Sequence, residues 1–293
     1  MMRIVSFMLT VVALFTNTLA PVLSPVKAPL DGGERVHYGE AYNQVYDIYV
    51  PDDAEDEVDV LFVIHGGGWI FYDQTQYDEK LKTACDDHDL VAVGMDYRKI
   101  QNGASALEML DDVDAAVESV KEYLEDRGLT PDKMVLAGHS SGAHLSTVYA
   151  YSHYDDSPIE IGFLATAGCP SSFFDSNTER FLPVKAISCA LLSILTDEEI
   201  NLLNLDKKQD AVNSVTALSM VNPLVPPTLI IHGKKDKMVS YENAVKLEEA
   251  LKENGVPCEL ITYENSDHLL EEDSATMDEF MVSEFYRFAS LYL

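Results

Sequence analysis

Basic residues are scarce in this chain. Its 293 residues include 20 Lys or Arg but 50 Asp or Glu, so the formal net charge is −30. Nucleic-acid binders hold phosphates with clustered Lys and Arg, and anionic membranes attract polybasic segments. The composition therefore argues against nucleic acid as a partner and against attachment to lipid by charge.

The first hydrophobic run is also too short for a membrane anchor. The apolar stretch 4–15 falls below the ~20 residues that span a bilayer. It follows Arg3 and precedes a small-residue site that ends at Ala20, an arrangement typical of a secretory signal peptide. We therefore expect cleavage after Ala20, or as late as Ala28, and a secreted or cell-surface protein. A buried first helix is the alternative.

Cysteines are few, and they have neither a Cys-x-x-Cys pair nor a metal-ligand spacing. The four are Cys85, Cys169, Cys189 and Cys258. An exported protein could join two of them, and four cysteines allow three full pairings. The sequence does not choose among the pairings, so no disulfide is predicted, and it indicates no metal site.

Apolar residues make up 47% of the chain, enough for a sizeable core. Short β-branched and aromatic runs predict strands, and segments with a 3.6-residue apolar period predict helices between them. The predicted strands are 45–50, 58–64, 90–97, 134–137, 161–165, 228–232 and 259–263, and the predicted helices are 106–126, 241–251 and 277–291. This alternation indicates a single α/β domain over 29–293, with a mainly parallel sheet and helices on both faces.

One serine stands in a turn motif between a strand and a helix. Residues 138–142 read Gly-His-Ser-Ser-Gly, directly after the predicted strand 134–137 and before an apolar helical pattern. Glycines in G-x-S-x-G permit a sharp turn that lifts the serine oxygen above the sheet. The motif predicts Ser140 as a nucleophile, with the Ser141 N–H at a helix N-terminus as an oxyanion donor.

A run of three glycines follows another predicted strand, 58–64. Residues 65–69 read His-Gly-Gly-Gly-Trp. Adjacent glycines let backbone N–H groups approach a ligand closely. We expect the N–H groups of Gly67 and Gly68 to complete an oxyanion hole with Ser141. An ordinary glycine-rich turn is the alternative.

Aromatic residues adjoin the glycine run and recur in a later segment. Trp69, Phe71 and Tyr72 would form part of a substrate pocket wall, with ordinary core packing as an equal alternative. The segment 171–222 fits the strand and helix alternation poorly and contains a helix-like stretch at 187–195. We expect a cap-like insertion over the carboxyl edge of the sheet, or equally a structural excursion away from it.

A serine nucleophile needs a base, and the base needs an acid to orient it. Asp236 and His268 each lie in a loop just after a predicted strand, and with Ser140 they follow the order Ser, Asp, His. His268 would accept and return the serine proton, while Asp236 would hold the imidazole tautomer. Asp267 is the weaker candidate acid because it is the immediate chain neighbour of the base.

These motifs together resemble those of the α/β-hydrolase esterase and lipase group. The group includes hormone-sensitive-lipase-like carboxylesterases and bacterial feruloyl-esterase-like enzymes, with kynurenine formamidase as a close relative. The matching positions are residues 65–69, 96–98, 138–145, 232–236 and His268. The sequence departs from the group at Ser141, where Ala is usual, and beside His268, where many relatives have Gly.

The resemblance and the predicted residues imply a serine carboxylesterase that hydrolyses small acyl esters through an acyl-enzyme. Such chemistry requires no metal or organic cofactor. Export would suggest an extracellular ester, for example acyl groups on plant polysaccharide, and the acidic surface favours a neutral substrate. The alternatives are an amidase or peptidase of the arylformamidase kind, and a non-catalytic binding protein on the same fold. The sequence does not determine the oligomeric state.

Overall fold

A single eight-stranded sheet organises the computed structural model, which describes residues 27–88, 90–174 and 182–293. Its strand order is β1-β2-β4-β3-β5-β6-β7-β8. The strands are β1 Gly33–His37, β2 Val45–Tyr49, β3 Glu57–Ile64, β4 Val91–Met95, β5 Thr130–His139, β6 Glu160–Ala167, β7 Thr228–Gly233 and β8 Cys258–Tyr263. The β1–β2 and β2–β4 pairs are antiparallel, and the pairs from β4–β3 to β7–β8 are parallel.

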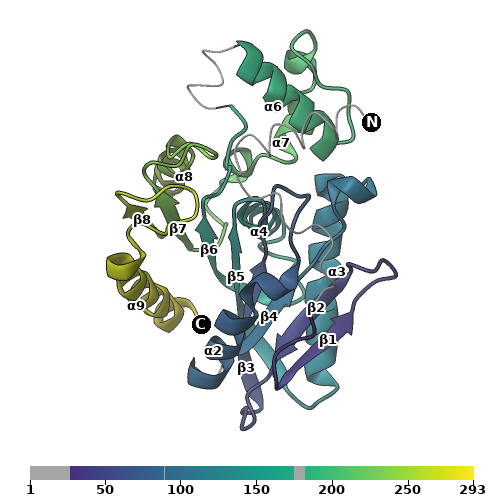
Figure 1. Cartoon of the computed structure of the whole chain (residues 1–293), viewed down its shortest axis with the longest axis vertical. Helices are drawn as coiled ribbons and strands as arrows, with labels where there is room; N and C mark the ends of the chain where they lie inside the picture. The colour runs from purple at the N-terminus through teal and green to yellow at the C-terminus, as the bar shows by residue number, and fades with distance from the viewer. Residues whose placement is uncertain (1–26, 89, 175–181) are drawn as a thin grey trace.

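Helices occupy the connections between the strands (Figure 1). They are α2 Asp78–His88, α3 Ala106–Glu125, α4 Ser141–Ser152, α6 Leu182–Leu195, α7 Gln209–Asn213, α8 Glu242–Glu253 and α9 Ser274–Tyr292, with 3-10 turns η1 Gln74–Tyr77, η2 Ile100–Asn102, η3 Leu205–Lys207 and η4 Ala217–Met220. No helix in the described ranges has the length and hydropathy to cross a membrane. The predicted signal segment, residues 1–20, lies outside the described residues.

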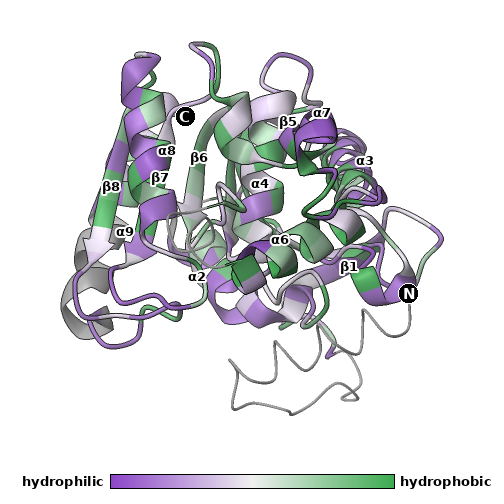
Figure 2. Ribbon diagram, turned by 90° about the horizontal axis from the view of Figure 1, so that it is seen from above, coloured by the Kyte–Doolittle hydropathy of each residue, from purple (hydrophilic) through white to green (hydrophobic). Residues whose placement is uncertain are grey.

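The predicted α/β fold is confirmed, and helices cover both faces of the sheet. Successive strand residues point to opposite faces, so a doubly covered strand is apolar throughout. In β3, Phe62 packs in the cluster that contains Val113 of α3 and Leu247 of α8. Its neighbour Leu61 packs instead against the clusters that contain Leu81 of α2 and residues of α9. In Figure 2, hydrophilic and hydrophobic residues alternate along α3 and α8, whereas much of α6 is hydrophobic.

The short helix α7 was not predicted from the sequence, and neither were β1 and α2, of which little is apolar. The edge strand β1 reads Gly-Glu-Arg-Val-His and has no fully buried residue. Arg35 ties it to β2 through its Nε atom, 2.6 Å from Asp47 Oδ1. Helix α2 buries Leu81, Ala84 and Cys85 but is otherwise charged or polar. Both elements depend on neighbours in the tertiary structure rather than on a local hydrophobic pattern.

Asp78, the first residue of α2, is a buried carboxyl group with one oxygen that has no hydrogen-bond partner among the described residues. Burial, and next the negative charge of Asp47, raise the pKa of Asp78 to about 6. A raised folded-state pKa means that ionisation costs folding free energy above pH 6, and that the cost disappears as the pH falls through the ordinary carboxyl value.

We therefore expect Asp78→Asn to increase the free energy of unfolding at pH 8 by roughly 1–2 kcal/mol, and to have almost no effect near pH 4. Urea unfolding of both proteins at the two pH values measures the difference. A variant less stable than wild type at pH 8 would contradict the expectation.

Candidate active site

Ser140 lies in the turn between β5 and α4, in a backbone conformation that non-glycine residues rarely adopt (φ 56°, ψ −119°). The flanking glycines are required by close packing. A Cβ atom on Gly138 would lie 2.5 Å from the Gly142 carbonyl, and one on Gly142 would lie 2.1 Å from the Ile64 carbonyl oxygen. The predicted turn therefore forms here, pressed against the end of β3.

We expect Gly142→Ala to destabilise the protein by on the order of 3 kcal/mol and to lower activity at least tenfold, because the turn must move away from Ile64 and His65. Thermal unfolding and ester hydrolysis measure the two effects. Gly128→Ala is the control for adding a methyl group to a glycine: its positive φ (78°) strains the backbone of the variant, but nothing lies within 4 Å of the added methyl group. Equal losses in both variants would show that packing at the turn is unimportant.

Three predicted residues from separate loops form one hydrogen-bonded chain. Ser140 Oγ lies 2.8 Å from His268 Nε2, and His268 Nδ1 lies 2.5 Å from Asp236 Oδ2. These residues follow β5, β8 and β7 respectively, so the parallel sheet brings the three carboxyl ends to one edge. The hydroxyl can thus donate to a ring whose other nitrogen donates to a carboxylate.

Four N–H groups surround the Asp236 carboxylate. Oδ1 accepts hydrogen bonds from the backbone N–H groups of Met238 (2.8 Å) and Val239 (2.9 Å). Oδ2 faces His268 and also His232, whose Nε2 is 3.3 Å away. Burial alone would raise the pKa of Asp236, but the hydrogen bonds from His232 and His268 outweigh it and hold the pKa well below its usual range. Asp236 is therefore ionised.

The alternative acid, Asp267, does not contact the base ring. It is exposed, and its Oδ1 accepts a hydrogen bond from the Leu269 N–H at 3.0 Å. The geometry therefore agrees with the preference for Asp236 over Asp267, because the Asp267 side chain is directed away from the ring of its neighbour His268.

Sequence reasoning missed two residues that hold the His268 loop. His139 Nε2 donates to the His268 carbonyl oxygen at 2.9 Å. Burial, with the nearby His268 ring, lowers the pKa of His139 to about 4, so its imidazole is neutral. Gly168, just after β6, has φ 57°, and a Cβ atom there would lie 3.1 Å from His268 Cε1. A glycine directly after a strand was the available signal for the second residue.

The glycine run forms a tight loop beside the nucleophile. A Cβ atom on Gly66 would lie 3.3 Å from Ser140 Cβ, so the loop and the turn are in contact. The Gly67 carbonyl accepts hydrogen bonds from the N–H groups of Ile70 (3.2 Å) and Phe71 (3.0 Å). Gly67 and Gly68 have positive φ values of 120° and 64°. Nothing lies within 4 Å of a Cβ atom at Gly68, whose surroundings are open.

Ser141, the third predicted oxyanion donor, is the first residue of α4. The first N–H groups of a helix have no partner within it, so the Ser141 N–H is available to an acceptor beside Ser140. The Ser141 side chain is buried, and its hydroxyl has no hydrogen-bond partner among the described residues.

The three predicted pocket aromatics differ in exposure. The Trp69 side chain is buried, with its ring edge-on to His144 (centroids 5.2 Å apart) and 6.4 Å from the Phe173 ring. Phe71 is half-buried and Tyr72 is 55% exposed. Trp69 therefore packs between α4 and the segment after β6, while Tyr72 is the one of the three that solvent reaches readily.

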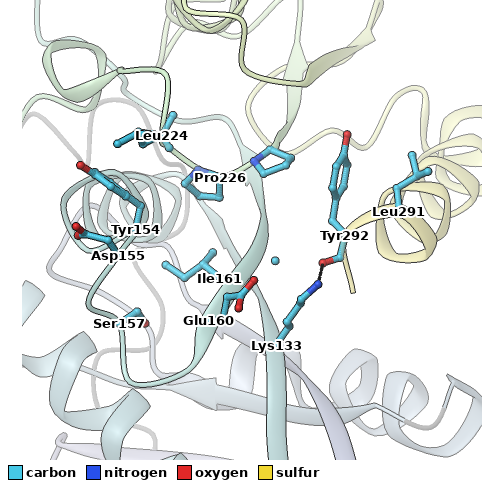
Figure 3. Close-up of a pocket in the computed structure, with 13 residues that line it drawn as sticks. Lys133, Tyr154, Asp155, Ser157, Glu160, Ile161, Leu224, Pro226, Leu291 and Tyr292 are labelled. Atoms are coloured by element: carbon cyan, nitrogen blue, oxygen red, sulfur yellow. Dashed lines mark hydrogen bonds between the residues drawn. The ribbon is translucent and has the colours of Figure 1, made fainter.

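A cleft of about 600 Å³ lies at the opposite edge of the sheet (Figure 3). Lys133, Glu160 and Pro226 line it near the amino ends of β5, β6 and β7. Lys133 Nζ donates to the Tyr292 carbonyl oxygen at 3.0 Å. This cleft is thus separate from the Ser140 edge and contains none of the predicted site residues.

The mainly parallel sheet and the serine turn have the arrangement of an α/β-hydrolase fold. An esterase structure from Thermogutta terrifontis superposes with a TM-score of 0.69 at 20% identity, covering 89% of this chain and 93% of that one. The BD-FAE family model matches residues 46–251, so the chain belongs to the BD-FAE family.

Two curated relatives are similar over parts of their length. A probable isoprenylcysteine alpha-carbonyl methylesterase of Arabidopsis thaliana is 24% identical over 240 residues, which are 79% of this chain and 49% of that protein. The kynurenine formamidase of Danio rerio is 32% identical over 139 residues, 45% of this chain and 44% of that protein. The chain thus spans about half the length of these curated relatives.

Proposed function

We propose that this protein is a serine carboxylesterase that hydrolyses small acyl esters through an acyl-enzyme. The hydrogen-bonded chain from Ser140 through His268 to Asp236 carries the proposal. Membership of the BD-FAE family and the similarity to a methylesterase support it.

In the proposed reaction, Ser140 Oγ attacks the ester carbonyl carbon while His268 Nε2 takes the hydroxyl proton. The carbonyl oxygen becomes an oxyanion, which accepts hydrogen bonds from the N–H groups of Gly67, Gly68 and Ser141. Collapse of the intermediate breaks the bond to the alkoxy oxygen, and His268 gives it the proton. His268 then takes a proton from a water molecule, whose oxygen attacks the acyl carbon. The bond from that carbon to Ser140 Oγ breaks, Oγ takes the proton back from His268, and the acid is released.

The decisive experiment is fluorophosphonate labelling of the wild type beside Ser140→Ala, with hydrolysis of p-nitrophenyl acetate, butyrate and octanoate. We expect labelling and hydrolysis in the wild type only, with faster turnover of the short esters. Absence of Ser140-dependent labelling would eliminate the serine hydrolase and leave a non-catalytic binding protein on this fold.

The second candidate function is an amidase of the arylformamidase kind, which the similarity to kynurenine formamidase favours. The same serine could attack a formamide carbonyl, with an amine as the leaving group. Parallel rates on N-formylkynurenine and p-nitrophenyl butyrate separate the two activities. A higher kcat/KM on the formamide would replace the esterase proposal.

We propose further that residues 171–222 cap the site within a single catalytic domain. Figure 1 shows α6 and α7 beyond the end of the sheet, above α4. The Phe173 ring contact with Trp69 joins the start of this segment to the glycine loop.

The proposed location is outside the cell or at its surface, and the proposed substrate is an acylated polysaccharide. The test is release of acetate or ferulate from decorated xylan. A null result beside good activity on p-nitrophenyl acetate would reject that substrate.

N-terminal sequencing of the exported protein tests the proposed location. We expect cleavage after Ala20 or Ala28, and an intact N-terminus would contradict the predicted signal peptide.

A further inference from the structure

Tyr72 combines an exposed aromatic side chain with a strained backbone. Its side chain is 55% exposed, and its φ of 69° lies in the left-handed region, which bulky residues rarely adopt. Glycine enters this region without steric cost. A ring that is more than half exposed gains little from packing, so folding alone does not account for a tyrosine at this position.

Hydrogen bonds on both sides hold the Tyr72 backbone in this conformation. Before it, the N–H groups of the two preceding residues donate to the Gly67 carbonyl oxygen. After it, Asp73 Oδ1 accepts hydrogen bonds from the Thr75 N–H at 3.0 Å and from Thr75 Oγ1 at 2.6 Å. Strained residues persist where the surrounding structure fixes them, and they cluster at active sites and where ligands are held. The strained conformation is therefore built into the loop.

Strain of this kind is concentrated around the proposed catalytic residues. Apart from glycine, five of the described residues have positive φ values, and four of them lie in the glycine loop, the serine turn or the loop of the base. These four are Trp69, Tyr72, Ser140 and Leu270, and the fifth is Asp197. Of the four, Tyr72 is the one whose side chain is exposed. Its side chain is thus free to contact a substrate.

The Tyr72 ring lies against the glycine loop. A Cβ atom on Gly67 would lie 2.8 Å from Tyr72 Cδ2, so the ring packs on the Gly67 backbone. Gly67 is a proposed oxyanion donor, and its neighbour Gly66 is in contact with the nucleophile, since a Cβ atom there would lie 3.3 Å from Ser140 Cβ. The exposed part of the ring is therefore within reach of a group attached to an ester carbonyl at Ser140.

We infer that Tyr72 is a specificity-determining residue, and that its ring binds an apolar group flanking the ester carbonyl. Aromatic carbon gains free energy when it covers apolar surface, and it offers no compensation to a charged group that loses its hydration. The 50 acidic residues of the chain, against 20 basic ones, repel anionic groups as well. The inference rests on the proposed ester hydrolysis for the reaction, whereas binding to the ring does not require turnover.

The first test measures how variants discriminate between esters with small and larger apolar groups. Tyr72→Phe keeps the ring, whereas Tyr72→Ala and Tyr72→Gly remove it. One ratio compares kcat/KM for p-nitrophenyl butyrate and acetate, and a second compares phenyl acetate and methyl acetate in a pH-stat. We expect loss of the ring to lower one ratio about tenfold, and Tyr72→Phe to leave both within about twofold of wild type. The first ratio falls if the ring contacts the acyl group, and the second if it contacts the alcohol.

The two variants without the ring separate substrate contact from folding. Alanine retains the strained backbone and glycine relieves it, so the unfolding midpoint should be a few degrees higher in Tyr72→Gly than in Tyr72→Ala. A role in substrate selection predicts the same loss of discrimination in both variants. Discrimination that is lost in Tyr72→Ala but retained in Tyr72→Gly would follow stability instead, and would overturn the inference.

Tyr42→Ala is the control for losing an exposed tyrosine ring. Tyr42 is 66% exposed and lies in the turn between β1 and β2, so both ratios should remain those of the wild type. Ratios that change equally in Tyr42→Ala and Tyr72→Ala would overturn the assignment to Tyr72. Unchanged ratios in both ring-free variants would overturn it as well, and would leave the proposed esterase intact.

If the wild type hydrolyses no ester, binding decides the inference. NMR titration of Ser140→Ala with p-nitrophenyl butyrate gives a Kd, which should rise about fivefold or more when Tyr72→Ala is added. That rise, beside an inactive wild type, would reject the esterase and retain the role of Tyr72. An unchanged Kd, or no measurable binding, would reject both.

Discussion

Replacing His268 by alanine is expected to lower kcat for ester hydrolysis by about 10⁶-fold. Ser140 is a poor nucleophile until its proton is removed, and His268 Nε2 is the group within reach, 2.8 Å from Ser140 Oγ. The remaining members of the chain cannot act alone, because Asp236 contacts the imidazole and not the hydroxyl. Initial rates on p-nitrophenyl butyrate, with thermal unfolding to verify folding, measure the loss.

The matched control for this prediction is His37→Ala. His37 is exposed on β1, far along the sheet order from the strands that carry the proposed site, and its loss should leave kcat unchanged. A His268→Ala protein that is folded and retains more than about a hundredth of wild-type kcat would contradict the role of general base.

Asp236→Asn is expected to lower kcat by about 10⁴-fold while the chain remains folded. All four groups that face this side chain are N–H donors: two backbone groups on Oδ1 and two histidine rings at Oδ2. An amide has one acceptor oxygen and one N–H₂ group, so in either orientation it sets donors against donors. His268 could avoid this clash of donors by moving its ring proton from Nδ1 to Nε2. In that tautomer Nε2 cannot accept the proton of Ser140.

The control for the acid is Asp267→Asn, an equal chemical change one residue from the base. Asp267 is exposed and does not contact the His268 ring, so kcat should remain within about twofold of wild type. A larger loss in Asp267→Asn than in Asp236→Asn would reverse the assignment of the acid.

The Asp236 carboxyl group also makes the stability of the protein depend on pH. Because the folded-state pKa of Asp236 is lowered, its contribution to stability is present above the ordinary carboxyl value and is lost as the pH falls through the folded-state value. The difference in free energy of unfolding between wild type and Asp236→Asn should thus be largest near pH 7 and shrink below pH 4. Urea unfolding across this range tests the sign; a difference that grows on acidification would contradict it.

Much of the fold could be predicted because the central strands are buried on both faces. The run at 60–64 is apolar at every position, and each such position contacts a helix on one side or the other. All seven predicted strands are present within a few residues, as are helices α3, α8 and α9. Prediction failed at the short helix α7 and at β1 and α2, whose residues are mostly exposed or half-buried, so that the hydrophobic pattern is weak.

The candidate site divides in the same way between local and distant interactions. Two of the glycines have local reasons, since a Cβ atom on Gly138 would meet Gly142 and one on Gly67 would meet Phe71. Gly142 and Gly66 instead leave room for Ile64 and His139, which are distant in the sequence. The support for His268 is not local. His139 reaches it across 129 positions of sequence, and Gly168 leaves room for its ring, contacts that no short pattern encodes.

The sequence by itself determined the class of fold, the serine turn, and which aspartate and histidine follow strand ends, because these depend on hydrophobic period and on turn chemistry. Only the tertiary structure decided that Asp236 lies among four donors and that His139 and Gly168 support His268. Protonation and hydrogen-bond direction depend on groups brought together from different strands. Their positions are set by the packing of the whole sheet and not by neighbours along the chain.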